Sequence, residues 1–184
     1  MRNLEWKSRL ADLADAERIA QAIGATFGGD LYQFDTYFHA AGGRLKLRAT
    51  GGGNGELIFY QRPEDAPTRW SDYFKAPVAS PDVLRAVLTR ALGVRARVEK
   101  TRRLYLYRGA RIHLDRVTRL GTFVEFEVPT MADADADAET GGGTGPGGDA
   151  EAARATMREL MQAFGLTAGD AITASYGEMI ADLR

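Results

Sequence analysis

The residues best suited to chemistry lie close together, within residues 111–128. His113 and Asp115 alternate there with apolar residues, and Glu125 and Glu127 do the same after an expected turn. Every second side chain of a β-strand points to the same face, and such neighbours lie roughly 6.5 Å apart along the strand. Three carboxylates and an imidazole on one surface are costly unless a cation compensates them, and hard oxygen ligands of this kind suit Mg²⁺ or Mn²⁺.

Basic residues alternate in the same way on other expected strands. Arg44, Lys46 and Arg48 share one strand face, and Lys100 and Arg102 share another. Arginine and lysine bind phosphate oxygens, whereas carboxylates bind the divalent cation that accompanies a polyphosphate. The recurrence of charged faces on several strands therefore favours one shared site for an anion and a metal.

Each charged face also has a simpler interpretation. A single alternating charged strand is usually a solvated face of a sheet, and Arg–Glu pairs on neighbouring strands contribute about 0.2–1 kcal/mol each. A lone histidine such as His113 more often forms an ordinary hydrogen bond than binds a metal. If Arg44, Lys46 and Arg48 lay on an outer surface, away from Glu125, the sheet would be open and this interpretation would hold.

The order of the elements predicts an α+β fold. The expected strands are residues 3–10, 29–38, 43–50, 55–62, 69–78, 95–108, 110–117 and 121–129, and the expected helices are 15–25, 80–93, 150–164 and 174–183. Short connections make most neighbouring strands antiparallel, so we expect a closed or nearly closed sheet with helices packed outside. The charged strand faces would then point either to solvent or into a shared interior.

Composition narrows the class of protein. The 184 residues suffice for one large domain or two small ones, and the absence of cysteine excludes disulfides and thiolate chemistry. No apolar run approaches the roughly 20 residues of a membrane helix, and the charged N-terminus has no signal-peptide core, so a cytoplasmic location is the default expectation. Residues 130–149, rich in Asp, Ala and Gly, are expected to form a flexible acidic loop. Without that loop the chain is mildly basic, which suits an anionic small molecule and is too weak to indicate nucleic acid.

A series of paired motifs runs along nearly the whole chain. They are Asn3-x-Glu5-x-Lys7, Asp35-x-Tyr37-Phe38, Arg44-Leu-Lys-Leu-Arg48, Lys100-x-Arg102, His113-x-Asp115-x-Val117, Leu120-Gly121-x-Phe123-x-Glu125-x-Glu127 and Ser175-Tyr176. Their order resembles the CYTH superfamily, the triphosphate tunnel metalloenzymes. The resemblance implies one domain over residues 1–184, a tunnel of eight antiparallel strands, Mg²⁺ or Mn²⁺ as cofactor, and a triphosphate such as ATP as the small-molecule partner. It leaves a homodimer open.

The resemblance also implies roles for individual residues. Glu5, Asp115, Glu125 and Glu127 would bind the metal, and Glu5 and Lys7 would take part in catalysis. The residues that would bind phosphate are Lys7, Arg44, Lys46, Arg48, Arg62, Lys100 and Arg102. His113 lies beside the metal ligands and completes the set of candidate site residues.

Two positions depart from the family pattern. Asn3 stands where the first glutamate of the N-terminal Glu-x-Glu-x-Lys motif is expected, which removes one negative charge near the metal. Gln61 stands where the family often has a lysine, so a phosphate contact is lost or moves to Arg62.

Within the superfamily the chain is most similar to class IV adenylyl cyclase-like proteins. Such an enzyme would promote attack of the ribose 3′-hydroxyl of ATP on the α-phosphorus, releasing pyrophosphate. A triphosphatase, acting on inorganic, thiamine or nucleoside triphosphate, would instead direct water at the γ-phosphorus. A non-catalytic triphosphate-binding module is a third hypothesis, favoured by Asn3. The sequence does not choose among the three.

Overall fold

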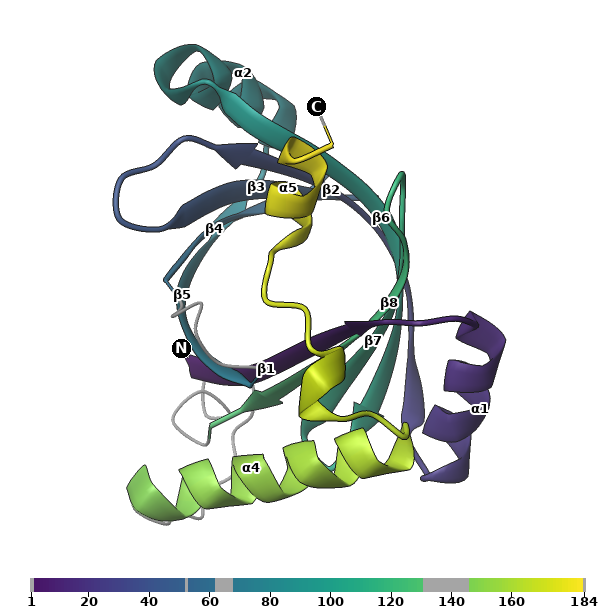
Figure 1. Ribbon diagram of the computed structural model, residues 1–184. Coiled ribbons are helices and arrows are strands. Elements are labelled where there is room, and N and C mark those ends of the chain that lie inside the picture. Colours follow the sequence, from purple (N-terminus) through teal and green to yellow (C-terminus); the bar gives the residue numbers. More distant parts are fainter. Residues whose placement is uncertain (1, 52, 62–67, 131–145, 184) are drawn as a thin grey trace.

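The computed structural model describes residues 2–51, 53–61, 68–130 and 146–183. Eight strands form a closed barrel in which each hydrogen-bonded pair is antiparallel (Figure 1). The strands are β1 (Arg2–Arg9), β2 (Thr26–Phe38), β3 (Arg44–Thr50), β4 (Gly55–Gln61), β5 (Arg69–Val78), β6 (Val94–Tyr107), β7 (Ala110–Val117) and β8 (Gly121–Pro129). The helices are α1 (Leu13–Ala22), α2 (Pro81–Leu92), α4 (Pro146–Ala163) and α5 (Tyr176–Ala181), with a short 3₁₀ helix η1 (Ala168–Asp170) before α5. The expected α+β tunnel is confirmed.

The first strand closes the barrel. The order around the barrel is β1-β5-β4-β3-β2-β6-β7-β8, so β1 pairs with both β5 and β8. The register of β1 and β8 places Glu5 opposite Glu127 and Lys7 opposite Glu125. The Asn3-x-Glu5-x-Lys7 and Glu125-x-Glu127 motifs, far apart in the sequence, are therefore direct neighbours in the sheet.

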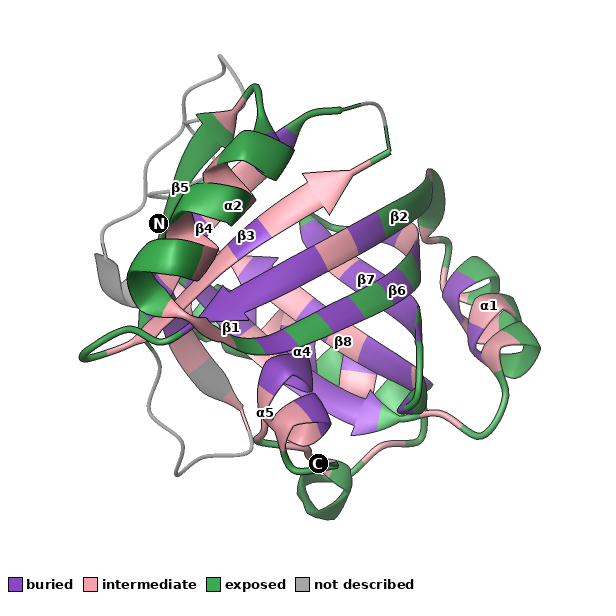
Figure 2. Ribbon diagram, turned by 90° about the horizontal axis from the view of Figure 1, so that it is seen from above, coloured by how far each residue is buried: buried purple, intermediate pink, exposed green. Residues whose placement is uncertain are grey.

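Alternation along the strands gives the barrel two different surfaces. Buried and exposed residues alternate along β6, as Figure 2 shows. On β1, Leu4 and Trp6 point outward: Trp6 is 1% exposed and stacks on Phe126 of β8 with ring centroids 5.6 Å apart. Helix α4 covers this outer surface and buries Leu160, and the ring of Phe164, which directly follows the helix, packs edge-on against Phe126. Burial of each such side chain contributes about 1.5–3 kcal/mol.

The helices begin and end at residues set by local capping contacts. These ends differ slightly from the ends that the periodicity of the sequence predicts. Helix α1 begins earlier than expected because the side chain of Asp12 accepts a hydrogen bond from the Ala14 amide and caps the helix. Helix α4 begins at Pro146, so residues 146–149 are helical and do not belong to a loop. Of the rest of the expected acidic loop, residues 131–145 lie outside the described residues.

The C-terminal segment returns to the barrel. It runs from α4 through η1 to α5 across one end of the barrel (Figure 1), where the Ile172 amide donates a hydrogen bond of 2.8 Å to the carbonyl oxygen of Lys7. Helix α5 packs against β6, and Ile180 joins a core cluster with Phe123 of β8. None of the helices in the described ranges is long and apolar enough to cross a membrane.

Candidate functional site

The charged strand faces point into the barrel, where they surround a cavity of about 290 Å³. Among the candidate residues from the sequence, those that line this cavity are Glu5, Lys7, Lys46, Arg48, Lys100, Arg102, His113, Glu125 and Glu127. The open-sheet alternative is therefore wrong for these strands. The closed barrel explains the pattern, because inward and outward side chains alternate along each strand and these charged ones face the interior.

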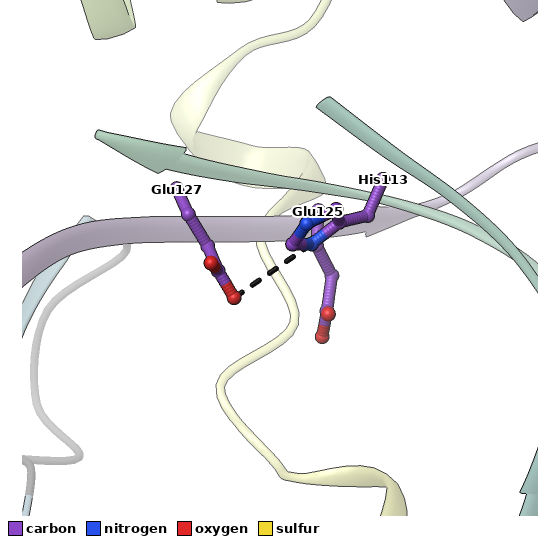
Figure 3. A group of neighbouring side chains, drawn as sticks. All are labelled: His113, Glu125 and Glu127. Atoms are coloured by element: carbon purple, nitrogen blue, oxygen red, sulfur yellow. Dashed lines mark ion pairs between the residues drawn. The ribbon is translucent and has the colours of Figure 1, made fainter. Parts of the chain in front are cut away.

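One wall carries a carboxylate–imidazole group. His113 on β7 and Glu125 on β8 are cross-strand partners, and Glu127 follows Glu125 on the same face. Each of the three residues offers an atom that could bind a metal, and these atoms lie within 4.8 Å of one another. Figure 3 shows the three side chains from two neighbouring strands, with His113 Nδ1 3.7 Å from Glu127 Oε1.

The surroundings fix the protonation of this group. Burial, followed by the charge of Arg102, lowers the pKa of His113 to about 3, so the imidazole is neutral at physiological pH. Burial alone would raise the pKa of Glu125, but Arg102 and Lys7 outweigh it and hold that pKa well below its usual value. Both Lys7, 3.6 Å from Glu125, and Arg111, 3.0 Å from Glu127, form ion pairs with the carboxylates.

These residues fit a divalent cation. His113 is 4% exposed, and its Nδ1 atom is buried without a hydrogen-bond partner. A neutral imidazole with an unused lone pair beside two ionised carboxylates is a suitable set of metal ligands. Glu5 faces Glu127 across the β1–β8 pair and lines the same cavity.

The basic residues are organised around two buried aspartates. Asp35 on β2 accepts two hydrogen bonds of 2.8 Å from Arg48 and lies 3.4 Å from Lys46 Nζ. Asp115 on β7 likewise forms ion pairs with Arg102 and Lys100 on β6. Each aspartate orients one arginine and one lysine of the cavity wall, and oriented guanidinium and ammonium groups of this kind can bind phosphate oxygens.

Asp115 does not line the cavity, although the family resemblance implies that its carboxylate binds the metal. Its side chain is fully buried and accepts hydrogen bonds of 2.7 and 2.6 Å from Arg102, while Lys100 Nζ lies at 3.3 Å. The hydroxyl of Tyr176 donates a further bond of 3.0 Å. Asp115 is thus surrounded by cations of the protein, and its role as a metal ligand stays a prediction.

Arg44 also lies apart from the main cavity. It lines a smaller neighbouring cavity of about 140 Å³, and its Nε and Nη2 atoms donate to Glu178 Oε1 at 2.9 and 2.7 Å. Its expected contact with phosphate stays a prediction. Arg62 falls outside the described residues.

The pair of Arg44 and Glu178 holds the C-terminal segment. Glu178 also accepts a hydrogen bond of 2.7 Å from the Ser175 amide at the start of α5. Burial would raise the pKa of Glu178, but the bonds from Ser175 and Arg44 lower it from 4.5 to about 2.

We expect Glu178→Gln to lower the free energy of unfolding by about 1 kcal/mol, because a helix cap and an ion pair are weakened together. Since the folded-state pKa is depressed, the difference from the wild type should be full above pH 4.5 and decrease as the pH falls toward 2. Urea unfolding at several pH values measures it. An equal difference at pH 7 and pH 3 would contradict the assignment.

Sequence reasoning missed several cavity residues. Gln33 on β2 lines the cavity. Asp35, two residues later on the same strand, does not line it but is buried and holds Arg48, and it received no role although it stands in one of the quoted motifs. Arg111 begins the alternation that contains His113. The alternation of side chains along the expected strands could have identified all three, because each lies an even number of residues from a recognised residue of the same strand. Tyr176 carries no such signal, because it lies on a helix far along the chain.

The comparisons with known proteins agree with this geometry. The family model of the CYTH domain matches residues 1–140. Among proteins of curated function, none matches the chain.

Solved structures share the fold over nearly the whole chain. The PH1012 protein of Pyrococcus horikoshii OT3 is 23% identical with a TM-score of 0.76, and the match covers 97% of this chain and 99% of that one. A candidate adenylate cyclase from Vibrio parahaemolyticus is 20% identical with a TM-score of 0.71, with 97% of both chains covered. A candidate adenylyl cyclase from Hippeastrum, described as having a dominant triphosphatase activity, is 13% identical with a TM-score of 0.65, and 99% of this chain and 96% of that one are covered.

Identities this low show the fold alone, whereas the family match extends over most of the chain. That match includes the strands that supply the carboxylates and all of the cavity bases described above. The chain belongs to the CYTH domain family.

Proposed function

We propose that this protein binds a triphosphate together with a divalent cation and converts it. The observation that carries the proposal is that one cavity is lined both by a carboxylate–imidazole group and by oriented lysine and arginine side chains. His113, Glu125 and Glu127 form the first, and the lysine–arginine pairs held by Asp35 and Asp115 form the second. A polyphosphate with its cation requires this arrangement of opposite charges.

In this proposal each wall has its own role. His113, Glu125 and Glu127 would hold the cation, with Glu5 across the β1–β8 pair. Because an imidazole is among the ligands, we favour Mn²⁺ over Mg²⁺, which prefers oxygen ligands and retains water. A bound divalent cation would neutralise charge that develops on the reacting phosphate oxygens.

The basic residues would orient the triphosphate for reaction. Lys46, Arg48, Lys100 and Arg102 would bind the phosphate oxygens and keep the chain of phosphates in one orientation. Lys7 lies next to Glu125, so it would contact the phosphate nearest the metal. Positioning and charge neutralisation suffice for phosphoryl chemistry, which needs no protein nucleophile.

Two reactions fit this site, and we place adenylyl cyclisation first. The Vibrio protein is named for that activity and the Hippeastrum protein for a dominant triphosphatase activity, so hydrolysis is the second candidate. Incubation with Mn²⁺ or Mg²⁺ and ATP, inorganic triphosphate or thiamine triphosphate separates them. Cyclic AMP with pyrophosphate supports cyclisation, orthophosphate supports hydrolysis, and binding without products supports a non-catalytic triphosphate-binding module.

Binding of a triphosphate should take up a proton through Lys46. Burial, followed by the charge of Arg48, lowers the pKa of Lys46 to about 7, so this ammonium is largely neutral at pH 8. A bound anion favours the charged form, so affinity should fall as the pH rises above about 7. Titration calorimetry at pH 8, in two buffers with different ionisation enthalpies, measures the proton uptake.

Lys46→Arg is the matched variant, because a guanidinium stays charged at pH 8. It should remove most of the proton uptake while retaining affinity. Equal proton uptake in both proteins would show that another group titrates.

A further inference from the structure

Tyr176 belongs to the cavity although it lies beyond residues 1–140, which the family model matches. It is the first residue of α5 and is 4% exposed. Its ring lines the cavity together with Ser175. A segment that runs across the end of the barrel therefore supplies part of the cavity wall (Figure 1).

The Tyr176 ring contacts two ammonium groups. Lys7 Nζ lies 4.4 Å from the ring centroid and Lys100 Nζ lies 4.9 Å from it. Both lysines line the cavity, and they come from β1 and β6, which are not neighbours in the barrel. An aromatic face attracts cations by its quadrupole, and the attraction is larger where water is excluded.

The hydroxyl group of Tyr176 contacts Asp115, the carboxylate that holds Arg102 and Lys100. It donates to Asp115 Oδ2, the oxygen that also receives Arg102 Nη2 at 2.6 Å and lies 3.3 Å from Lys100 Nζ. Tyr176 and Lys100 therefore share one oxygen of this carboxylate. The ring and the hydroxyl thus act on the same ammonium group from two sides.

The ring itself is firmly placed. It packs edge-on against Phe123, with centroids 5.0 Å apart. The residue that follows must be small, because a Cβ atom on Gly177 would approach the Tyr37 ring to 2.8 Å. Ser175 and Glu178 form a capping box that fixes the start of α5. A rigid support of this kind can orient flexible lysine side chains.

We propose that Tyr176 is a positioning residue, whose ring holds the Lys7 and Lys100 ammonium groups ready for the phosphate oxygens. The inference rests on the proposed function in one respect, since the ligand is taken to be a polyphosphate. Without the ring, the two flexible lysine side chains would sample more conformations, and binding would have to order them at an entropic cost.

Binding of inorganic triphosphate without metal, which avoids turnover, tests the proposal by calorimetry. Tyr176→Leu should weaken binding about tenfold, because two cation–π contacts are lost. Tyr176→Phe keeps the ring and should restore the affinity to within about threefold of the wild type. Phe164→Leu is the matched control, because Phe164 packs edge-on against Phe126 at 5.1 Å, outside the cavity, and should leave binding unchanged.

Other outcomes would overturn the proposal. Affinity within twofold of the wild type for Tyr176→Leu would show that the ring does not position the lysines. Equal losses for Tyr176→Leu and Tyr176→Phe would assign the effect to the hydroxyl. An equal loss for Phe164→Leu would show a general effect of destabilisation. If Tyr176→Leu does not fold, Tyr176→Met takes its place.

A second measurement does not depend on any ligand. The lysines of the chain are Lys7, Lys46, Lys75 and Lys100, so their side-chain resonances can be assigned individually. The Hε resonances of Lys7 and Lys100 should be shifted upfield by the Tyr176 ring and should move in Tyr176→Leu. Lys75 lies 5.3 Å from the Tyr73 ring instead, so its Hε resonances should not move in this variant. If the wild type binds no triphosphate, the proposed function fails and this result still decides whether the ring orients the lysines.

Discussion

Replacing Glu125 and Glu127 together by glutamine is expected to abolish metal-dependent conversion of the triphosphate. Both carboxylates would be metal ligands, and loss of even the partners that orient such ligands lowers metal affinity by about 10–100-fold. We therefore expect the double variant to bind Mn²⁺ more than about 100-fold more weakly. Glutamine keeps the shape of the side chains, so circular dichroism should show an intact barrel. Titration with Mn²⁺ and a product assay measure the two effects.

Glu99→Gln is the control for this experiment, because Glu99 lies exposed on the outer face of β6. It should leave metal affinity and turnover unchanged. Retention of metal-dependent triphosphate binding in the double variant would refute the assignment of the metal site to this wall.

Asp115→Asn is expected to affect stability more than metal binding. The variant would leave Arg102 and Lys100 buried, at 4% and 3% exposure, without their main counter-charge. Loss of one partner of a buried ion pair typically costs about 3–5 kcal/mol, so we expect a decrease of that size in the free energy of unfolding. Mn²⁺ affinity should change less than threefold, because Asp115 is separated from the cavity. Chemical denaturation and metal titration on the same samples measure both.

The comparison variant is Asp72→Asn, whose side chain is 68% exposed and 3.7 Å from Arg2. An exposed pair of this kind contributes less than about 1 kcal/mol. If Asp115→Asn lost metal affinity and kept its stability, Asp115 would be a metal ligand, as the family resemblance implies.

The barrel could be predicted because alternation along each strand is a strong and local signal. On β1, for example, Leu4 and Trp6 face outward while Glu5 and Lys7 face inward. The recurrence of charges on one side of several strands favoured a shared interior over solvated strand faces. The ends of the helices could be predicted less well, since they depend on single capping contacts such as that of Asp12.

Which charged residues pair with one another could not be predicted in full, because the pairing depends on the register of neighbouring strands. Arg102 pairs with Asp115 across β6 and β7, and this alignment decides that the carboxylate faces cations of the protein. The position of Arg44 depends on Glu178, which arrives only when the C-terminal segment packs against the barrel. Contacts between residues so far apart in sequence leave no periodic signal in either segment.

The closure of the barrel between β1 and β8 has a consequence for how the protein folds. Leu4 pairs with Val128, so the first strand synthesised waits for the last strand before the sheet can close. Folds dominated by such non-local pairings acquire their native contacts slowly. Lys7, Glu125 and Tyr176 meet only after that step, when the C-terminal segment adds its bond from Ile172. A ligand that bridges these residues would bind only the completed barrel, and by mass action the free energy of unfolding would rise with the logarithm of its concentration.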